Sequence, residues 1–249
     1  MCLIVVAWRI HPDYPLVVAA NRDEFYARPS AAIARWPDAP HVIGGRDLEA
    51  GGTWLGITDS ERFAAVTNVR EQGMAKGVLT RGALARNFLT SELAASDYAQ
   101  KLDNQQYSGF NLLLADGDEL VYCTNRDGAP RVLPPGVYGL SNHLLDSPWP
   151  KLLTARHRLA AALPRLPDTS PLFELLADSE IVADHELPST GVSLEWERLL
   201  SAIFVRSAAY GTRASTVAWL RRDGTVSVQE KTFGPNGQAL QSSLISTGV

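Results

Sequence analysis

Two stretches near the N-terminus decide the fold: the apolar run CLIVVAW at residues 2–8, and LVVAANRDE at residues 16–24, which begins with a second apolar run. The first is a near-continuous run of β-branched and other apolar residues, which is typical of a strand buried on both faces. Between them, HPDYP at residues 11–15 has the proline and aspartate of a turn. Because both strands rise by about 3.3 Å per residue, this hairpin returns NRDE, at residues 21–24, to the level of Cys2.

The remaining elements alternate between strand-like and helix-like patterns. Residues 25–50, rich in Pro, Ala and Gly, predict a loop anchored by Trp36. Strands are predicted at 51–56, 62–68, 110–114, 120–123, 137–141, 201–205, 212–220 and 225–232, and helices at 81–95, from 96–97 onward, at 147–162 and at 170–177. Strands, then paired helices, then strands again predict an α+β fold of antiparallel sheets covered by helices, in one domain over residues 1–249.

Composition narrows the function classes. The 249 residues carry 23 basic and 27 acidic side chains, and a net charge of -4 gives no electrostatic reason to bind nucleic acid. The two cysteines, Cys2 and Cys123, do not form the pattern of a secreted disulfide scaffold. No stretch approaches the roughly 20 apolar residues of a membrane span, and no secretory signal precedes the first strand. We therefore expect a cytoplasmic protein that acts on a small molecule; its oligomeric state has no signal in the sequence.

Cys2 is the sharpest candidate for chemistry. Methionine excision generally proceeds before a small second residue, and its product would carry a free α-amine and a thiol on one residue. An α-amine titrates near 7.7–8.0, so it is a usable base within reach of its own sulfur. The alternative is that Cys2 is a small hydrophobe that opens a buried strand. Cys123, in a predicted strand, is expected to be inert.

The NRDE tetrapeptide ends the strand beside Cys2. Asp23 could hold a terminal ammonium by a charge-assisted hydrogen bond, and Arg22 could favour the thiolate. The alternative is a solvated turn with an ion pair, as most such runs are.

Several motifs occur in an order that resembles the NRDE protein family, which includes the transport-and-Golgi-organisation proteins of animals. They are MC at residues 1–2, NRDEF at 21–25 with RP at 28–29, GGTWLG at 51–56, TN at 67–68, GFNL at 109–112, YGLSN at 138–142 and YGTR at 210–213. The resemblance runs from residue 1 to about residue 233. The NRDE family in turn is similar to cysteine N-terminal-nucleophile hydrolases such as penicillin V acylase and bile salt hydrolase.

That second resemblance implies a four-layer αββα sandwich and attack on a non-peptide amide by the Cys2 thiolate, with hydrolysis or acyl transfer as the outcome. Asp23 would fix the terminal amine. Asn68, through its backbone N–H, and Asn142, through its side-chain amide, would form the oxyanion hole. Arg213 would stabilise the region of the nucleophile. The alternatives are that both asparagines are turn residues at strand ends and that Arg213 is a surface cation.

The sequence departs from the amidases at one position. In them an arginine directly precedes the asparagine of this turn, whereas here Ala20 does. Arg22 lies two residues later and is expected on the same face of the strand, displaced by about 6.6 Å. A retained Met1 would block the amine.

Two other functions stay open. The NRDE resemblance also implies haem trafficking or lipid and acyl-chain binding, with haem as an alternative cofactor and no other cofactor or metal expected. Candidate haem ligands are Cys2, His11, His41, His143, His157 and His185, none of them in an attachment motif. The third reading is a fold that serves as an interaction module without catalysis.

Overall fold

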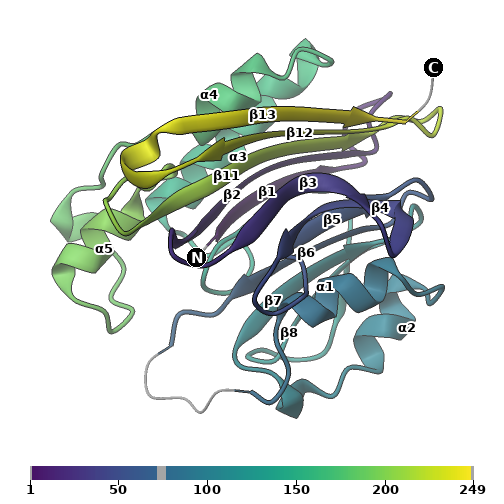
Figure 1. Ribbon diagram of the computed structural model, residues 1–249, viewed down its shortest axis with the longest axis horizontal. Helices are drawn as coiled ribbons and strands as arrows, with labels where there is room; N and C mark the ends of the chain where they lie inside the picture. The colour runs from purple at the N-terminus through teal and green to yellow at the C-terminus, as the bar shows by residue number, and fades with distance from the viewer. Residues whose placement is uncertain (1, 72–76, 248–249) are drawn as a thin grey trace.

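The computed structural model describes residues 2–71 and 77–247, which form two antiparallel sheets packed face to face (Figure 1). The first sheet has the strand order β10-β1-β2-β11-β12-β13. Its strands are β1 (Cys2–Trp8), β2 (Leu16–Phe25), β10 (Gly136–Leu140), β11 (Tyr210–Leu220), β12 (Val226–Phe233) and β13 (Ala239–Ser246). The two N-terminal runs are therefore neighbours in the middle of this sheet, as predicted.

The second sheet runs in chain order from β3 to β9. Its strands are β3 (Ser30–Trp36), β4 (Ala39–Asp47), β5 (Leu55–Thr58), β6 (Phe63–Asn68), β7 (Phe110–Ala115), β8 (Leu120–Thr124) and β9 (Arg131–Leu133). Each strand pairs with its sequence neighbour, so this sheet is a meander; the connection between β6 and β7, residues 69–109, is long and holds two helices.

Helices cover the two outer faces and complete four layers (Figure 1). Helices α1 (Gly82–Leu89) and α2 (Ala95–Gln100) pack on the second sheet, and α3 (Pro150–Ala162) and α4 (Ser170–Leu176) on the first. Helix α5 (Leu194–Ser201) lies at one end of the first sheet, and short 3-10 turns occupy 104–106, 163–165, 184–186 and 235–237. The predicted αββα sandwich is thus confirmed.

Side-chain alternation in β1 explains why the first run is apolar throughout. Ile4, Val6 and Trp8 face the core between the sheets, whereas Leu3 and Val5 face the helix layer. Because both faces are covered, a strand in this position has no solvent-exposed side to make polar. Cys2 shares the inter-sheet face by the same alternation.

Several predicted elements are wrong. Residues 25–50 are not a loop, because most of them form β3 and β4, whose bulged pairing interrupts the apolar alternation. Residues 201–205 are not a strand, since α5 ends at Ser201 and irregular chain follows. The 81–95 helix ends at Leu89, and the 147–162 helix begins at Pro150 with Trp149 as its cap. Strands β9 and β13 and helix α5 were not predicted.

No helix in the described ranges is long and apolar enough to cross a membrane.

Candidate active site

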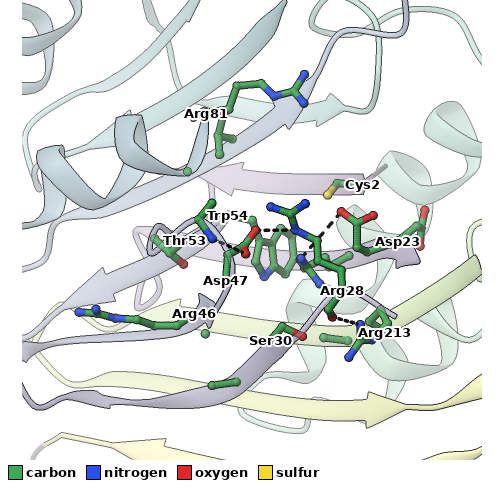
Figure 2. A pocket seen from close by; sticks show the side chains of 18 of the residues that line it. Cys2, Asp23, Arg28, Ser30, Arg46, Asp47, Thr53, Trp54, Arg81 and Arg213 are labelled. Carbon is green, nitrogen blue, oxygen red and sulfur yellow. Dashed lines mark hydrogen bonds and ion pairs between the residues drawn. The ribbon is translucent and has the colours of Figure 1, made fainter. Parts of the chain in front are cut away.

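A cavity of about 580 Å³ opens where the two sheets separate, and Cys2 lies on its wall (Figure 2). Its wall combines side chains from β2, from β3 and β4, from the segment before α1 and from β11 to β13. Nine of the described residues that line it with Cys2 are charged: Arg22, Asp23, Glu24, Arg28, Arg46, Asp47, Arg81, Arg213 and Glu230. Of the residues proposed from the sequence, all but Asn142 line this space.

Cys2 begins β1 and pairs directly with Arg22 of β2, so the thiol and the guanidinium leave the same face of the sheet. Only 9% of Cys2 is exposed. Burial raises the pKa of the thiol; the neighbouring Asp23 carboxylate raises it further, whereas Arg22 and a hydrogen bond from the Asp23 backbone lower it. The thiol therefore needs a base close by to become a nucleophile.

Asp23 is the next residue along β2 and is 2% exposed. Its carboxylate accepts a hydrogen bond of 2.7 Å from the Thr212 hydroxyl, and the Tyr210 hydroxyl donates to its backbone carbonyl at 3.3 Å. Burial raises the pKa of Asp23, while the nearby Lys151 ammonium lowers it. Figure 2 shows the carboxylate beside the Cys2 sulfur. An acid held in this way is placed to bind a cation at residue 2.

Lys151 of α3 is a buried ammonium behind Asp23. It is 6% exposed and its Nζ donates to the carbonyl of Leu200 at 2.7 Å. Burial lowers the pKa of Lys151 to about 8, against the opposing effect of Asp23. The sequence analysis missed this residue. A signal existed, because Lys151 lies on the same helical face as Ala155 and Leu159, where a lysine is unusual.

Lys151 should make stability rise with pH. Its pKa in the folded protein lies near 8 and its ordinary pKa is 10.5. Between these pH values the unfolded chain binds more protons than the folded chain, so the free energy of unfolding rises with pH. We expect the free energy of unfolding of the parent chain, minus that of Lys151→Met, to increase by up to about 3 kcal/mol from pH 8 to pH 10.5. Urea titrations in a Cys2→Ala background measure it, because burial raises the pKa of the Cys2 thiol and the thiol would add a pH dependence of its own. The exposed Lys101, changed to Met, is the control; a flat difference for Lys151 contradicts the prediction.

The backbone N–H of Asn68 faces the cavity. Val69 donates its N–H to Gly109 across the β6–β7 pair, so by strand alternation the N–H of Asn68 points away from β7. On that side the N–H of Val66 donates to the carbonyl of Trp54, the residue that directly precedes β5. Strand β5 therefore does not extend far enough to pair with Asn68. The amide of Asn68 is thus directed into the space that the missing partner strand leaves.

Asn142 follows β10 and is fully buried. Its side-chain amide donates to the carbonyl of Asn68 at 3.0 Å, and its own carbonyl accepts from the N–H of Arg70 at 2.7 Å. The preceding Ser141 donates its hydroxyl to the carbonyl of Cys2 at 3.0 Å, and its backbone carbonyl accepts from the Thr67 hydroxyl at 2.5 Å. This short segment therefore ties the start of β1 to the end of β6.

The two remaining arginines of the proposed site support its walls. Arg22 shares the inter-sheet face with Ala20, as predicted from the two-residue spacing. Its Nη2 lies 3.9 Å from Oε2 of Glu24. Arg213 occupies a bulge in β11, between Thr212 and Ala214 in the pairing with β2. Its guanidinium donates to backbone carbonyls at residues 25, 26 and 28, at 3.1, 3.4 and 2.7 Å, and so braces the turn that follows β2.

The histidines lie elsewhere. None of them is among the described residues that line the cavity, and His143 is hydrogen bonded to Ser147 at 2.8 Å. His41, His157 and His185 are exposed. The described residues contain no cluster of three or more His, Cys, Asp or Glu side chains arranged to hold a metal ion. Haem binding stays a prediction.

Comparisons with known proteins place the chain among named relatives. A sequence model of the family described as "Transport and Golgi organisation 2" matches residues 1–235. The "Transport and Golgi organization protein 2 homolog" of Bos taurus is 36% identical over 260 residues, which cover 94% of this chain and 93% of that protein. The Drosophila melanogaster "Transport and Golgi organization protein 2" is 27% identical over 275 residues, covering 96% and 95%.

Two solved structures share the architecture. The Caenorhabditis elegans N-acylethanolamine-hydrolyzing acid amidase ortholog superposes with a TM-score of 0.52 and 16% identity, covering 87% of this chain and 92% of that one. The C2A mutant of the conjugated bile acid hydrolase from Clostridium perfringens superposes with a TM-score of 0.56 and 9% identity, covering 99% of this chain and 92% of that one. At such identities the likeness shows the fold alone, the αββα sandwich that this chain shares with both proteins.

Proposed function

We propose that this chain, which belongs to the Transport and Golgi organisation 2 family, hydrolyses or transfers the acyl group of a non-peptide amide. Cys2 is the nucleophile after removal of Met1. The observation that carries the proposal is the meeting of Cys2, Asp23 and the inward-facing amide of Asn68 at one charged cavity. The fold shared with an amidase and a bile acid hydrolase supports it.

Activation of the nucleophile begins with the free amine of residue 2. The unprotonated α-amine accepts the thiol proton of Cys2, directly or through one water. The ammonium formed in this step is held by Asp23, whose carboxylate is already oriented by Thr212. Arg22, opposite Cys2 in the sheet, favours the resulting thiolate.

Acylation then proceeds at the cavity wall. The Cys2 thiolate attacks the amide carbon, and the carbonyl oxygen becomes an oxyanion that accepts a hydrogen bond from the N–H of Asn68. Asn142 does not line the cavity; its side-chain amide donates to the carbonyl of Asn68 and so positions that donor. Loss of one donor in such a hole costs about 3 kcal/mol in known enzymes. The C–N bond breaks as the ammonium of Cys2 returns its proton to the leaving amine, which leaves a thioester on Cys2.

The second half of the reaction releases the acyl group. Water, deprotonated by the same α-amine, attacks the thioester carbon, and the thiolate of Cys2 is the leaving group. The products are a carboxylate and the free enzyme. An amine or alcohol in place of water would give acyl transfer.

The proposal requires a mature N-terminus at Cys2. We expect the intact mass of protein from its native host to be lower than the sequence mass by one methionine residue, and an iodoacetamide probe to label Cys2 in the folded state. Cys123 is the internal control, because it is 4% exposed and burial raises its pKa to about 12. Retention of Met1, or labelling of Cys123 in place of Cys2, would rule out the proposed chemistry.

A further inference from the structure

Five arginines line the cavity, and four of them already have partners. Arg28 is paired with Asp47 at 2.8 Å, Arg46 with Asp38, and Arg22 lies 3.9 Å from Glu24. Arg213 donates to three backbone carbonyls. These side chains organise the walls, and their charges or donors are committed to the protein itself.

Arg81 differs from the other four. Among the described residues, no carboxylate lies within 4 Å of it, and its one hydrogen bond runs from Nη1 to the carbonyl of Gly109 at 3.2 Å. Besides the Cys2 thiol, the acidic groups that act on it are the carboxylates of Glu24 and Glu71. Glu24 lies beside Arg22, and Glu71 is bonded to Arg126 at 2.6 Å. The guanidinium therefore keeps donors for a group from outside the chain.

Arg81 also bears the cost of partial burial without an ion pair to offset it. Desolvation lowers the pKa of its guanidinium, although the nearby Cys2, Glu24 and Glu71 act in the opposite direction. A guanidinium does not lose its proton in proteins, so the charge stays. An anion entering the cavity would offset this desolvation cost.

The backbone around Arg81 is held rigidly against the wall that carries Asn68. Arg81 directly precedes α1, and the carbonyl of the next residue, Gly82, accepts a hydrogen bond from the N–H of Thr53 at 3.2 Å. Gly52 and Gly82 touch so closely that a Cβ added at Gly52 would lie 2.4 Å from the carbonyl carbon of Gly82. The Arg81 guanidinium and the N–H of Val69, the residue after Asn68, both donate to the carbonyl of Gly109, so the cation stands on the same side of the cavity as the proposed oxyanion donor.

We propose that Arg81 forms a subsite for a carboxylate carried by the amide substrate, as in an N-acyl amino acid. A carboxylate fits the planar fork of a guanidinium through two parallel hydrogen bonds. A phosphate dianion fits less well, because Asp23, Glu24, Asp47 and Glu230 line the same cavity. The inference rests on the proposed function, since it names the substrate class of that site.

Binding to Cys2→Ala protein, which cannot turn substrate over, tests the subsite without requiring catalysis. The ligands are N-decanoylglycine and N-decanoylethanolamine, which share the acyl chain and the amide and differ by the carboxylate. Calorimetry should show that the glycine conjugate binds at least about tenfold more tightly than the ethanolamide. Arg81→Gln should reduce that preference to below about threefold, and Arg81→Lys should retain part of it. The control is Arg35→Gln, an exposed arginine bonded to Asp59 outside the cavity, which should change nothing.

A salt series on the unaltered cavity keeps the test decisive even if Arg81→Gln fails to fold. Raising NaCl from about 50 to about 300 mM should weaken binding of the glycine conjugate and leave the ethanolamide unaffected. Equal affinity for the two ligands, or a preference that survives Arg81→Gln, overturns the subsite. If the preference is found but the wild-type protein hydrolyses neither compound, the subsite stands and the proposed hydrolase does not.

Discussion

Replacement of Cys2 by alanine is expected to lower kcat/KM for N-decanoylglycine by at least about 10⁴-fold, because the variant has no atom on which a thioester can form. The small side chain should leave the fold intact, since Cys2 opens a strand whose other residues make the apolar contacts. Release of glycine, followed with an amine-reactive dye, measures the effect. Mass spectrometry of quenched wild-type protein should reveal the acyl adduct on the N-terminal peptide.

Cys123→Ala is the matched control for this experiment. Cys123 lies in β8 and faces the helices α1 and α2, within the outer core and away from the cavity. Its removal should change kcat/KM by less than about twofold. Turnover that persists in Cys2→Ala, or an acyl adduct located on any other residue, would show that the chemistry does not pass through Cys2.

Loss of one partner of the ion pair between Arg70 and Glu197 should destabilise the protein by about 3–5 kcal/mol. The guanidinium Nη1 and the carboxylate Oε2 are 2.8 Å apart, and the two side chains are 5% and 6% exposed. Glu197 also accepts hydrogen bonds from the N–H and the hydroxyl of Thr190. Glu197→Gln removes the charge but keeps the shape, so the buried charge of Arg70 loses its counter-charge.

The consequence of that substitution should reach the active site. The backbone N–H of Arg70 donates to the carbonyl of Asn142, which in turn holds Asn68. We therefore expect Glu197→Gln to lower the urea midpoint of unfolding and also to reduce kcat more than it raises KM.

Two further variants test the explanation of that effect. Asp59→Asn breaks the exposed pair with Arg35, whose side chains are 40% and 41% exposed, and should cost no more than about 1 kcal/mol. The double change Arg70→Met with Glu197→Leu removes both charges and should recover most of the loss. If Glu197→Gln costs as little as Asp59→Asn, the pair does not hold this end of the fold together.

The predicted central strands are confirmed because their signal is local and strong. Residues 2–8 and 16–20 are apolar on both faces, and proline and aspartate between them specify a turn, so neither element depends on distant partners. The tetrapeptide at 21–24 was expected to end the strand beside Cys2. It does so with Arg22 directly opposite, and the face shared by Arg22 and Ala20 follows from the two-residue period of a strand.

The strands that the sequence analysis missed have a weak local signal. In β3 the alternation is broken by bulges, and in β13 most side chains are exposed because the strand forms the edge of its sheet. An edge strand buries too little apolar surface to leave a period-2 pattern.

The sequence by itself determined the sheet-forming hairpin, the presence of a thiol at residue 2 and the acid that stands beside it. These follow from neighbours a few residues apart, whose geometry a strand dictates. Only the tertiary structure decided that Lys151 stands behind Asp23, that Asn142 holds Asn68, and that Arg81 faces the cavity without a carboxylate partner. Each of these depends on strands and helices tens of residues apart in the chain, and such pairings are set by how whole faces pack, which no local pattern encodes.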